Sequence, residues 1–375
     1  MDFTLPESGS DVRTLARDIA TKIATPEHTA ELESADAPID STLWRELGTA
    51  GLLGLELPAA LVGDHGGDLS AVENLLVAEE LGRALARVPF GPHACAALPL
   101  IASRGSTTLR DRLLTAGAAG NLVIAVAVEE DLGIDSLSPA TTLTDGVLTG
   151  TKVNVSYATT ADALLVTAHT GAGPVVAVVD SATPGIRITP TPSTGLVPTA
   201  QIDFSDVTVT ADAILSDGPA AVGELVNRLT LAVCAEQTGI VSRALELTAE
   251  YAREREQFGR AIGSFQAVAQ RLADGYIDVQ GLSLTTTQAA WMLSGAEADT
   301  SDADLHTAIA TAKFWAAEAG HRVAHTAVHV HGGVGLDTSH PVHRYFLRAK
   351  QNEYTLGSAT ASLRTIGIDL AHIPA

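Results

Sequence analysis

The spacing of apolar residues divides the chain into three stretches. In the first, from about residue 10 to residue 115, apolar side chains recur every three or four positions, most clearly over 11–23, 41–50 and 70–86. This spacing places them on one side of a helix, so the first stretch is predicted to be mostly helical. Ser41 or Thr42 is the predicted N-cap of the second helix. Residues 64–67 are predicted to form a loop.

The second stretch is rich in β-branched residues and broken by turn-forming pairs such as Asp145-Gly146 and Pro184-Gly185. Short apolar runs at regular spacing, separated by such turns, are typical of strands. The pattern therefore predicts a small antiparallel β domain between two helical regions. Its predicted strands cover 121–128, 147–157, 163–167, 175–179, 186–188 and 201–209.

Helical spacing returns in the third stretch, where it predicts four helices at about 221–255, 264–294, 304–328 and 340–371. We therefore expect an α+β protein that is mostly α, with three domains. These are an N-terminal helical domain at 1–118, a middle β domain at 119–216 and a C-terminal four-helix bundle at 217–375.

Candidate chemistry concentrates at the junction of the first two helices of the third stretch. Gly259 and Gly263 interrupt the helical pattern, and Ser264 is the predicted N-cap of the next helix. Arg255, Phe258 and Gln266 offer a guanidinium fork, an aromatic ring and an amide, which suit a flat, anionic ligand such as an adenine dinucleotide. Spacing alone favours a plainer interpretation, in which Arg255 is a solvated cation at a helix end and Phe258 lies in the core.

Composition narrows the classes of partner. The formal net charge of −21 argues against nucleic acids and anionic membranes, and it fits poorly with unaided binding of CoA. No apolar run is long enough to span a bilayer, and the first residues lack the features of a signal peptide. Cys95 and Cys234 lie far apart among small apolar residues, so we expect buried free thiols and a cytoplasmic protein.

The junction resembles a signature of the acyl-CoA dehydrogenases, R-x-x-F-G-x-x-I-x-x-F-Q, with Arg255, Phe258 and Gln266 at matching positions. Residues 43–47, 51–55 and 66–67 resemble the N-terminal helical region of that family, and 329–335 resembles its Q-x-H-G-G-x-G turn. The resemblance implies the family's three-domain fold and its FAD chemistry, in which the α-proton and a β-hydride leave an acyl-CoA thioester. The C-terminal third is most similar to subunits of mixed actinobacterial tetramers that desaturate steroid side-chain thioesters.

The resemblance also implies that the catalytic base is missing. The family's usual glutamate position corresponds to Leu356, and leucine cannot accept a proton. Some relatives carry the base before an arginine farther upstream, but the nearest match here is Asn227-Arg228. Glu224 and Glu236 flank that position and are the only carboxylates that could replace it. No catalytic residue is therefore assigned.

Residues that would hold a flavin divide into two groups. The family's flavin-ring loop corresponds to 126–136, where Glu129, Glu130 and Asp131 would bring negative charge toward the pyrophosphate, and 153–156 lacks the family's tryptophan. By contrast, the elements that reach a neighbouring subunit's flavin are retained. The resemblance thus implies an FAD shared with a partner, with candidate cofactor-binding residues Arg255, Phe258, Gln266, His329, Val330, His331, Gly332 and Gly333.

A metal site is a weaker interpretation of the histidines. His321, His325 and His329 are four residues apart on a predicted helix, and His331 follows. Because no cysteine or close carboxylate completes a coordination shell, we expect polar packing or interface hydrogen bonds there and no metal.

We therefore expect the non-catalytic subunit of an α2β2 acyl-CoA dehydrogenase. The partner chain would supply the base, the flavin-ring loop and most CoA contacts, and an electron-transfer flavoprotein or a similar acceptor would take the electrons. Three alternatives stay open: a self-sufficient enzyme that uses Glu224 or Glu236, a flavin-free scaffold, and a base-free flavin oxidase or monooxygenase.

Overall fold

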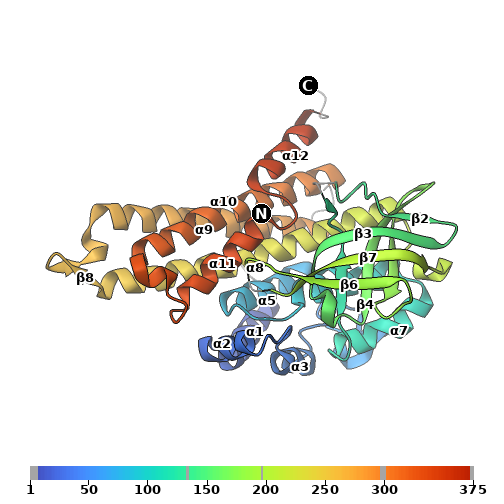
Figure 1. Ribbon diagram of the computed structural model, residues 1–375, viewed down its shortest axis with the longest axis horizontal. Helices are drawn as coiled ribbons and strands as arrows, with labels where there is room; N and C mark the ends of the chain where they lie inside the picture. The colour runs from blue at the N-terminus through green and yellow to red at the C-terminus, as the bar shows by residue number, and fades with distance from the viewer. Residues whose placement is uncertain (1–6, 132–134, 196, 296–300, 372–375) are drawn as a thin grey trace.

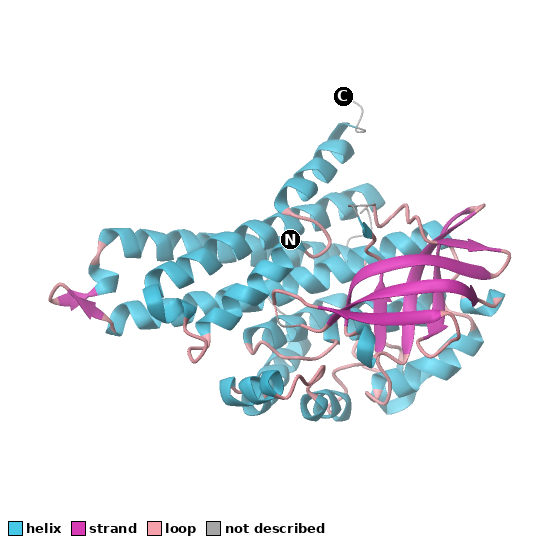
Figure 2. Ribbon diagram, in the orientation of Figure 1, coloured by secondary structure: helices cyan, strands magenta, loops and turns pink. Residues whose placement is uncertain are grey.

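The computed structural model describes residues 7–131, 135–195, 197–295 and 301–371. A group of short helices and a β-sheet lie against one end of a bundle of long helices (Figure 1). Figure 2 shows the sheet at one end of the molecule, while the far end of the bundle extends well beyond it and carries only a small hairpin. The sequence therefore folds into a mostly helical protein with a central sheet, as expected.

The N-terminal helices are more numerous than the apolar spacing predicted. Asp40, and not Ser41 or Thr42, caps α3, because its Oδ1 accepts from the backbone N–H groups of Thr42 and Leu43. Ser70 caps α5 in a capping box with Glu73. The described helices are α1 (Glu7–Ile23), α2 (Pro26–Ser34), α3 (Ser41–Thr49), α4 (Ala59–Val62), α5 (Ala71–Arg83), the π-helical η2 (Gly91–Ala97), α6 (Leu98–Arg104) and α7 (Thr107–Ala118).

The sheet is mixed, whereas an antiparallel one was expected. β4 runs parallel to β1 over Ala163 to Val166 and antiparallel to β5 over its whole length. All four residues of β1 are buried, as is common for parallel strands that are covered on both faces. The strand order is β1-β4-β2-β3-β7-β6, with β5 beside β4. The strands are β1 (Ile124–Ala127), β2 (Thr142–Thr144), β3 (Val147–Ser156), β4 (Ala163–Thr170), β5 (Gly173–Asp180), β6 (Ile186–Thr191) and β7 (Thr199–Thr208).

The bundle differs from the predicted four helices at its last member. The predicted helix at 340–371 is two helices, because Leu356 and Gly357 have φ of +57° and +108° and break it. Phe265, and not Ser264, is the N-cap of α9, since Ser264 lies in a 3₁₀ turn and donates to Ala261 O. The helices are α8 (Gly218–Glu254), α9 (Gln266–Leu293), α10 (Asp302–His331), α11 (Val342–Tyr354) and α12 (Ala359–Ala371).

Close contact between α5 and α8 ties the N-terminal helices to the bundle. A Cβ on Gly239 would lie 1.9 Å from Glu79 O, and one on Gly82 would lie 2.3 Å from Glu236 O. Glycine is therefore required at both positions for the two backbones to approach. This crossing fixes Glu236 beside the point where the helices and the sheet meet.

Both cysteines lie inside the fold. Cys95 and Cys234 are free and buried. Burial raises the pKa of Cys95 well above its ordinary value and that of Cys234 to about 12. Among the described helices, none combines the length and the apolar character needed to cross a membrane.

Candidate functional site

The junction between α8 and α9 forms a small hairpin at the far end of the bundle (Figure 1). Strands β8 (Glu256–Gln257) and β9 (Arg260–Ala261) pair around the two-residue turn Phe258-Gly259. Both turn residues have positive φ, +54° and +77°, as the tight turns of β-hairpins require. Arg255 precedes the hairpin as the C-cap of α8, and its carbonyl accepts from the Ile262 N–H at 2.8 Å.

Phe258 does not lie in the core. Its side chain is 92% exposed, so the interpretation that placed it in the interior is wrong. The rings of Phe258 and Phe265 are perpendicular, with centroids 6.1 Å apart, and the Arg260 guanidinium lies over the Phe265 ring at 4.1 Å. A phenylalanine held in a left-handed conformation and facing water stabilises little within its own chain. Such a residue is typical of a surface that another molecule covers.

The turn that follows α10 lies at the same end of the bundle. His331 stacks on Tyr251 of α8, with ring centroids 4.3 Å apart and planes 21° apart. Gly332 has φ of +62°, and a Cβ at Gly332 or at Gly333 would meet no neighbouring atom within 4 Å. Space is therefore open over both glycines, which leaves their backbone approachable from outside.

The predicted cofactor-binding residues divide into an exposed and a buried group. Val330 and His331 are 8% and 3% exposed. His331 Nδ1 donates to Ala327 O at 2.8 Å, and burial lowers the pKa of this imidazole, so His331 is a neutral brace of the turn. The exposed group, which can meet another molecule, is Arg255, Phe258, Gln266, His329, Gly332 and Gly333.

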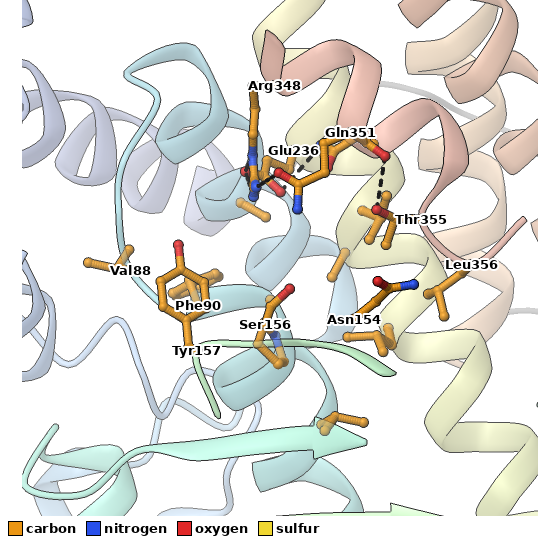
Figure 3. Close-up of a pocket in the computed structure, with 18 of the residues that line it drawn as sticks. Val88, Phe90, Asn154, Ser156, Tyr157, Glu236, Arg348, Gln351, Thr355 and Leu356 are labelled. Atoms are coloured by element: carbon orange, nitrogen blue, oxygen red, sulfur yellow. Dashed lines mark hydrogen bonds and ion pairs between the residues drawn. The ribbon is translucent and has the colours of Figure 1, made fainter. Parts of the chain in front are cut away.

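A second candidate site is a cavity where the N-terminal helices, the sheet and the bundle meet (Figure 3). Its walls come from α5, the segment that follows it, β1, β3, α8 and the end of α11. Leu356 lines this cavity, and so do Glu129, Asn154 and Ser156. The position at which the resemblance expects a base is therefore at the cavity, but its side chain is apolar.

Neither replacement carboxylate is free to act as a base. Glu224 accepts from Arg104 Nε at 2.8 Å and from Arg228 Nε at 3.0 Å. Burial alone would raise the pKa of Glu224, but Arg228 and Arg104 hold it below its ordinary value. Glu236 lines the cavity, but Arg348 Nε donates to it at 2.8 Å and Asn352 Nδ2 lies 3.4 Å from its second oxygen.

The two glutamates in the acidic loop after β1, Glu129 and Glu130, lie in different surroundings. Glu130 was expected to face a pyrophosphate, but it is buried against Lys152 Nζ at 2.7 Å and also accepts from Thr141. Lys152 is fully buried on β3, and no sequence signal pointed to it, because a lysine in a strand pattern is ordinarily a solvent-facing residue. Glu129 alone of this pair faces the cavity, and burial raises its pKa.

The histidines of α10 do not gather around a common point. His321 lies 3.2 Å from Glu353 Oε1 and 3.2 Å from Lys350 Nζ, and its ring is 4.5 Å from that of His325. His325 meets the Phe346 ring edge-on. Within the described residues, no group of three or more His, Cys, Asp or Glu side chains could hold a metal ion.

The two sites differ in their fit to a flavin dinucleotide. The bundle end combines an exposed guanidinium, an exposed ring and an open pair of glycines, which can meet phosphate, base and ribose groups. The cavity places the Glu129 carboxyl beside Leu356, and a carboxylate opposes an anionic cofactor. The residues at the bundle end therefore suit an anionic dinucleotide better than the lining of the cavity does.

The chain is similar to known proteins along its whole length. The family profile described as acyl-CoA dehydrogenase, N-terminal domain matches residues 6–121, and the corresponding C-terminal domain profile matches 217–370. The chain is 45% identical over 380 residues to acyl-CoA dehydrogenase FadE27 of Mycobacterium tuberculosis, covering 100% of both chains. It is 32% identical over 346 residues to FadE28 of the same organism, covering 90% of this chain and 97% of that one.

Solved structures of complexes are also similar. A chain of the ChsE4-ChsE5 complex from Mycobacterium tuberculosis superposes with a TM-score of 0.93 and 43% identity, covering 100% of both chains. A chain of a variant of the Tcur3481-Tcur3483 steroid ACAD superposes with a TM-score of 0.90 and 38% identity, covering 98% of this chain and 99% of that one.

Proposed function

Because the chain belongs to the acyl-CoA dehydrogenase family, we propose that it is the non-catalytic subunit of a heteromeric, FAD-dependent member of that family. The complex would desaturate the α,β bond of steroid side-chain acyl-CoA thioesters, and an electron-transfer flavoprotein or a similar acceptor would take the electrons. Support for the heteromer and the steroid comes from the two similar structures, one named as a complex of two proteins and the other as a steroid ACAD.

One observation carries the proposal: this chain retains the residues expected at one end of a flavin site and lacks those expected at the other. At the bundle end, Arg255 and Phe258 are exposed, and no atom within 4 Å would obstruct a side chain at Gly332. At the cavity, the position expected to hold the base is Leu356. The chain therefore keeps what a neighbour's cofactor would need and lacks what its own reaction would need.

In this proposal the bundle end binds the adenosine diphosphate part of the partner's FAD. Arg255 would neutralise a phosphate with its planar guanidinium, and the backbone of Gly332 and Gly333 would approach the cofactor because neither residue has a side chain. Phe258 would cover the cofactor and exclude water. The flavin itself supplies the hydride acceptor when it is bound. This chain would thus act by holding and orienting the cofactor.

Proton abstraction then falls to the partner. The α-proton of a thioester is weakly acidic, so its removal needs a carboxylate near the substrate. Glu224 and Glu236 are both engaged by arginines in this chain. The Glu224 carboxylate is a weaker base than a free one, because Arg228 and Arg104 lower its pKa.

The flavin content of the purified protein tests this proposal. The chain expressed alone should be colourless, and co-expression with the dehydrogenase-like partner should give a yellow complex with about half a flavin per chain. Arg255→Ala should then lower the flavin content of the complex without dissociating it, whereas Arg253→Ala, two residues earlier and also exposed, should not. A yellow protein without a partner, bleached by an acyl-CoA, would refute the shared site.

A self-sufficient enzyme is the second candidate, and one observation favours it: Glu236 is a carboxylate in the lining of the cavity. The double variant Glu224→Gln, Glu236→Gln separates the two candidates. The proposed function predicts that the complex keeps its turnover, and a self-sufficient enzyme would lose it. A flavin-free scaffold would leave the flavin content unchanged in Arg255→Ala.

A further inference from the structure

His331, at the end of α10, carries a buried polar atom that has no partner. Its Nδ1 donates to Ala327 O at 2.8 Å, but its Nε2 is buried and has no hydrogen-bond partner among the described residues. Nearly all buried polar groups in folded proteins are paired, so this nitrogen is an exception. In the neutral ring Nε2 is only an unused acceptor, whereas a protonated Nε2 would be a buried cation without a partner.

Tyr251 of α8 supports the His331 ring by stacking. The two ring centroids are 4.3 Å apart, and the planes are 21° apart. His331 is the last residue of α10, and Gly332 is the first residue of the 3₁₀ turn η7 (Gly332–Leu336). The position of this ring therefore sets where the glycine turn begins. Because Gly332 and Gly333 have no side chains of their own to pack, the turn depends on such a support.

The titratable groups around His331 bring it no counter-charge. The His340 ring lies 5.2 Å away, and His343 of α11 donates to His340 O through its Nδ1 at 2.6 Å. Asp337, the carboxylate of this segment, accepts from Ser339 instead. Burial lowers the pKa of His331, and the nearby His340 lowers it further. A proton on the buried ring is therefore unfavourable.

We propose that Tyr251 and His331 form a pH-dependent support for the glycine turn, so that the complex binds the partner's cofactor less tightly in acid. The neutral ring stays in the stack and holds Gly332 and Gly333 in place. A protonated ring leaves the stack to reach water, and the two glycines lose their fixed position. Tyr251 and His331 are thus positioning residues. This inference rests on the proposed function, because it adds a regulation to the same cofactor site.

Proton linkage gives the size and the sign of the effect. A displaced, solvated ring binds a proton more readily than the buried ring does, so acid favours the displaced turn. If only the neutral form holds the turn, the apparent Kd for FAD rises by up to about tenfold for each pH unit. Since the ordinary pKa of histidine is 6.5 and burial lowers that of His331, the rise begins below pH 6.5.

Equilibrium dialysis of the yellow complex at several pH values from 7.5 to 5 tests the proposal by measuring the Kd for FAD. The Kd of the wild-type complex should rise as the pH falls. His331→Phe keeps a ring against Tyr251 but cannot be protonated, so its Kd should rise less steeply, by up to about tenfold less per pH unit. Tyr251→Leu removes the stack and should raise the Kd about threefold to tenfold already at pH 7.5, whereas Tyr251→Phe should restore it.

The control is His169→Phe, which makes the same chemical change at an exposed position of β4 and should keep the pH dependence of the wild-type complex. The same pH dependence in His331→Phe as in the wild-type complex, or an unchanged Kd in Tyr251→Leu, overturns the proposal. If Arg255→Ala lowers the flavin content while the pH dependence is the same in both, only the pH-dependent support is refuted. A complex without flavin refutes the proposed function and the support together.

Discussion

Leu356 contributes no proton-accepting group to the cavity. Its side chain is apolar and lines the cavity, while its backbone N–H donates to the Glu129 carboxyl. The one carboxyl beside it is therefore already engaged, and burial raises the pKa of Glu129. At the residue scale, the position at which the resemblance expects a base therefore carries a side chain that cannot accept a proton.

Placing a carboxyl at this position tests that description. Leu356→Glu would put a second acidic group beside Glu129, so we expect a loss of about 1–3 kcal/mol in the free energy of unfolding. Both carboxyls would have raised pKa values in the folded state, so stability falls as pH rises above their unfolded values, and the loss is larger at pH 8 than at pH 5. Chemical denaturation at both pH values measures it.

The matched control is Leu356→Met, which conserves volume and should cost less than about 1.5 kcal/mol. We also expect that Leu356→Glu does not give the isolated chain any thioester desaturation, because the proposed cofactor site in this chain's own cavity stays unfavourable. Turnover by that variant, or stability independent of pH, contradicts this account.

At the scale of elements, the break between α11 and α12 depends on a residue far away in sequence. Lys313 of α10 is 2% exposed, and its Nζ donates to the carbonyls of Asn352 and Glu353 at 3.2 Å each. These carbonyls belong to the last turn of α11, where intrahelical partners are missing. A buried cation thus satisfies the helix end, and the chain can turn at Leu356 and Gly357.

The buried ammonium group of Lys313 should make the free energy of unfolding depend on pH. Burial lowers the pKa of Lys313 to about 8, below its ordinary 10.5. Between these values the unfolded chain holds a proton that the folded chain has lost, so stability rises with pH across that window. Relative to Lys313→Met, we expect the wild-type chain to gain up to about 3 kcal/mol between pH 8 and 10.5.

Denaturant titrations of both proteins at several pH values measure this difference. Groups that are present in both proteins, such as the buried Lys152, contribute equally to both free energies of unfolding, so their contributions cancel in the difference. A difference that stays flat from pH 7.5 to 10 would mean that Lys313 keeps its charge inside the fold.

The same elements show what the sequence could and could not predict. Apolar spacing predicted the long helices α8, α9 and α10 to within a few residues, because a continuous amphipathic pattern is a local signal. It did not separate α11 from α12, which part at Leu356 and Gly357, next to carbonyls that accept from Lys313, some 40 residues away. Likewise it missed the stack of Tyr251 on His331, because the two residues lie far apart in the sequence.

At the scale of the whole molecule, the fold separates two sites. The cavity lies where the N-terminal helices, the sheet and the bundle meet, and the Phe258 hairpin lies at the opposite end of the bundle (Figure 1). Family motifs located the hairpin and the glycine turn from sequence. Their exposure could not be predicted, because the apolar character of Phe258 favoured the core. A role for this end in assembly stays a prediction.

Substitution of Phe258 separates folding from assembly. Asparagine tolerates positive φ better than phenylalanine, so Phe258→Asn should leave the isolated chain as stable as before or slightly more stable. The complex should weaken by about tenfold or more, because an aromatic anchor is lost from its interface. Thermal unfolding and analytical ultracentrifugation measure the two effects.

The control for this variant is Leu61→Asn, which removes an exposed apolar side chain from α4 in the N-terminal helices and should leave assembly intact. Equal weakening by both variants would mean that a general loss of apolar surface, and not the hairpin, governs assembly. An unchanged complex in Phe258→Asn would remove the hairpin from the interface.

The buried cysteines have a practical consequence for labelling. Cys95 and Cys234 are the chain's only thiols, and both are buried with raised pKa values, so neither forms a reactive thiolate at neutral pH. A single cysteine introduced at the exposed Gln257 would then carry a dye selectively, with no need to remove the native ones. The fluorescence of a dye at position 257 could then report binding of a partner chain at the hairpin, with the rest of the natural sequence unchanged.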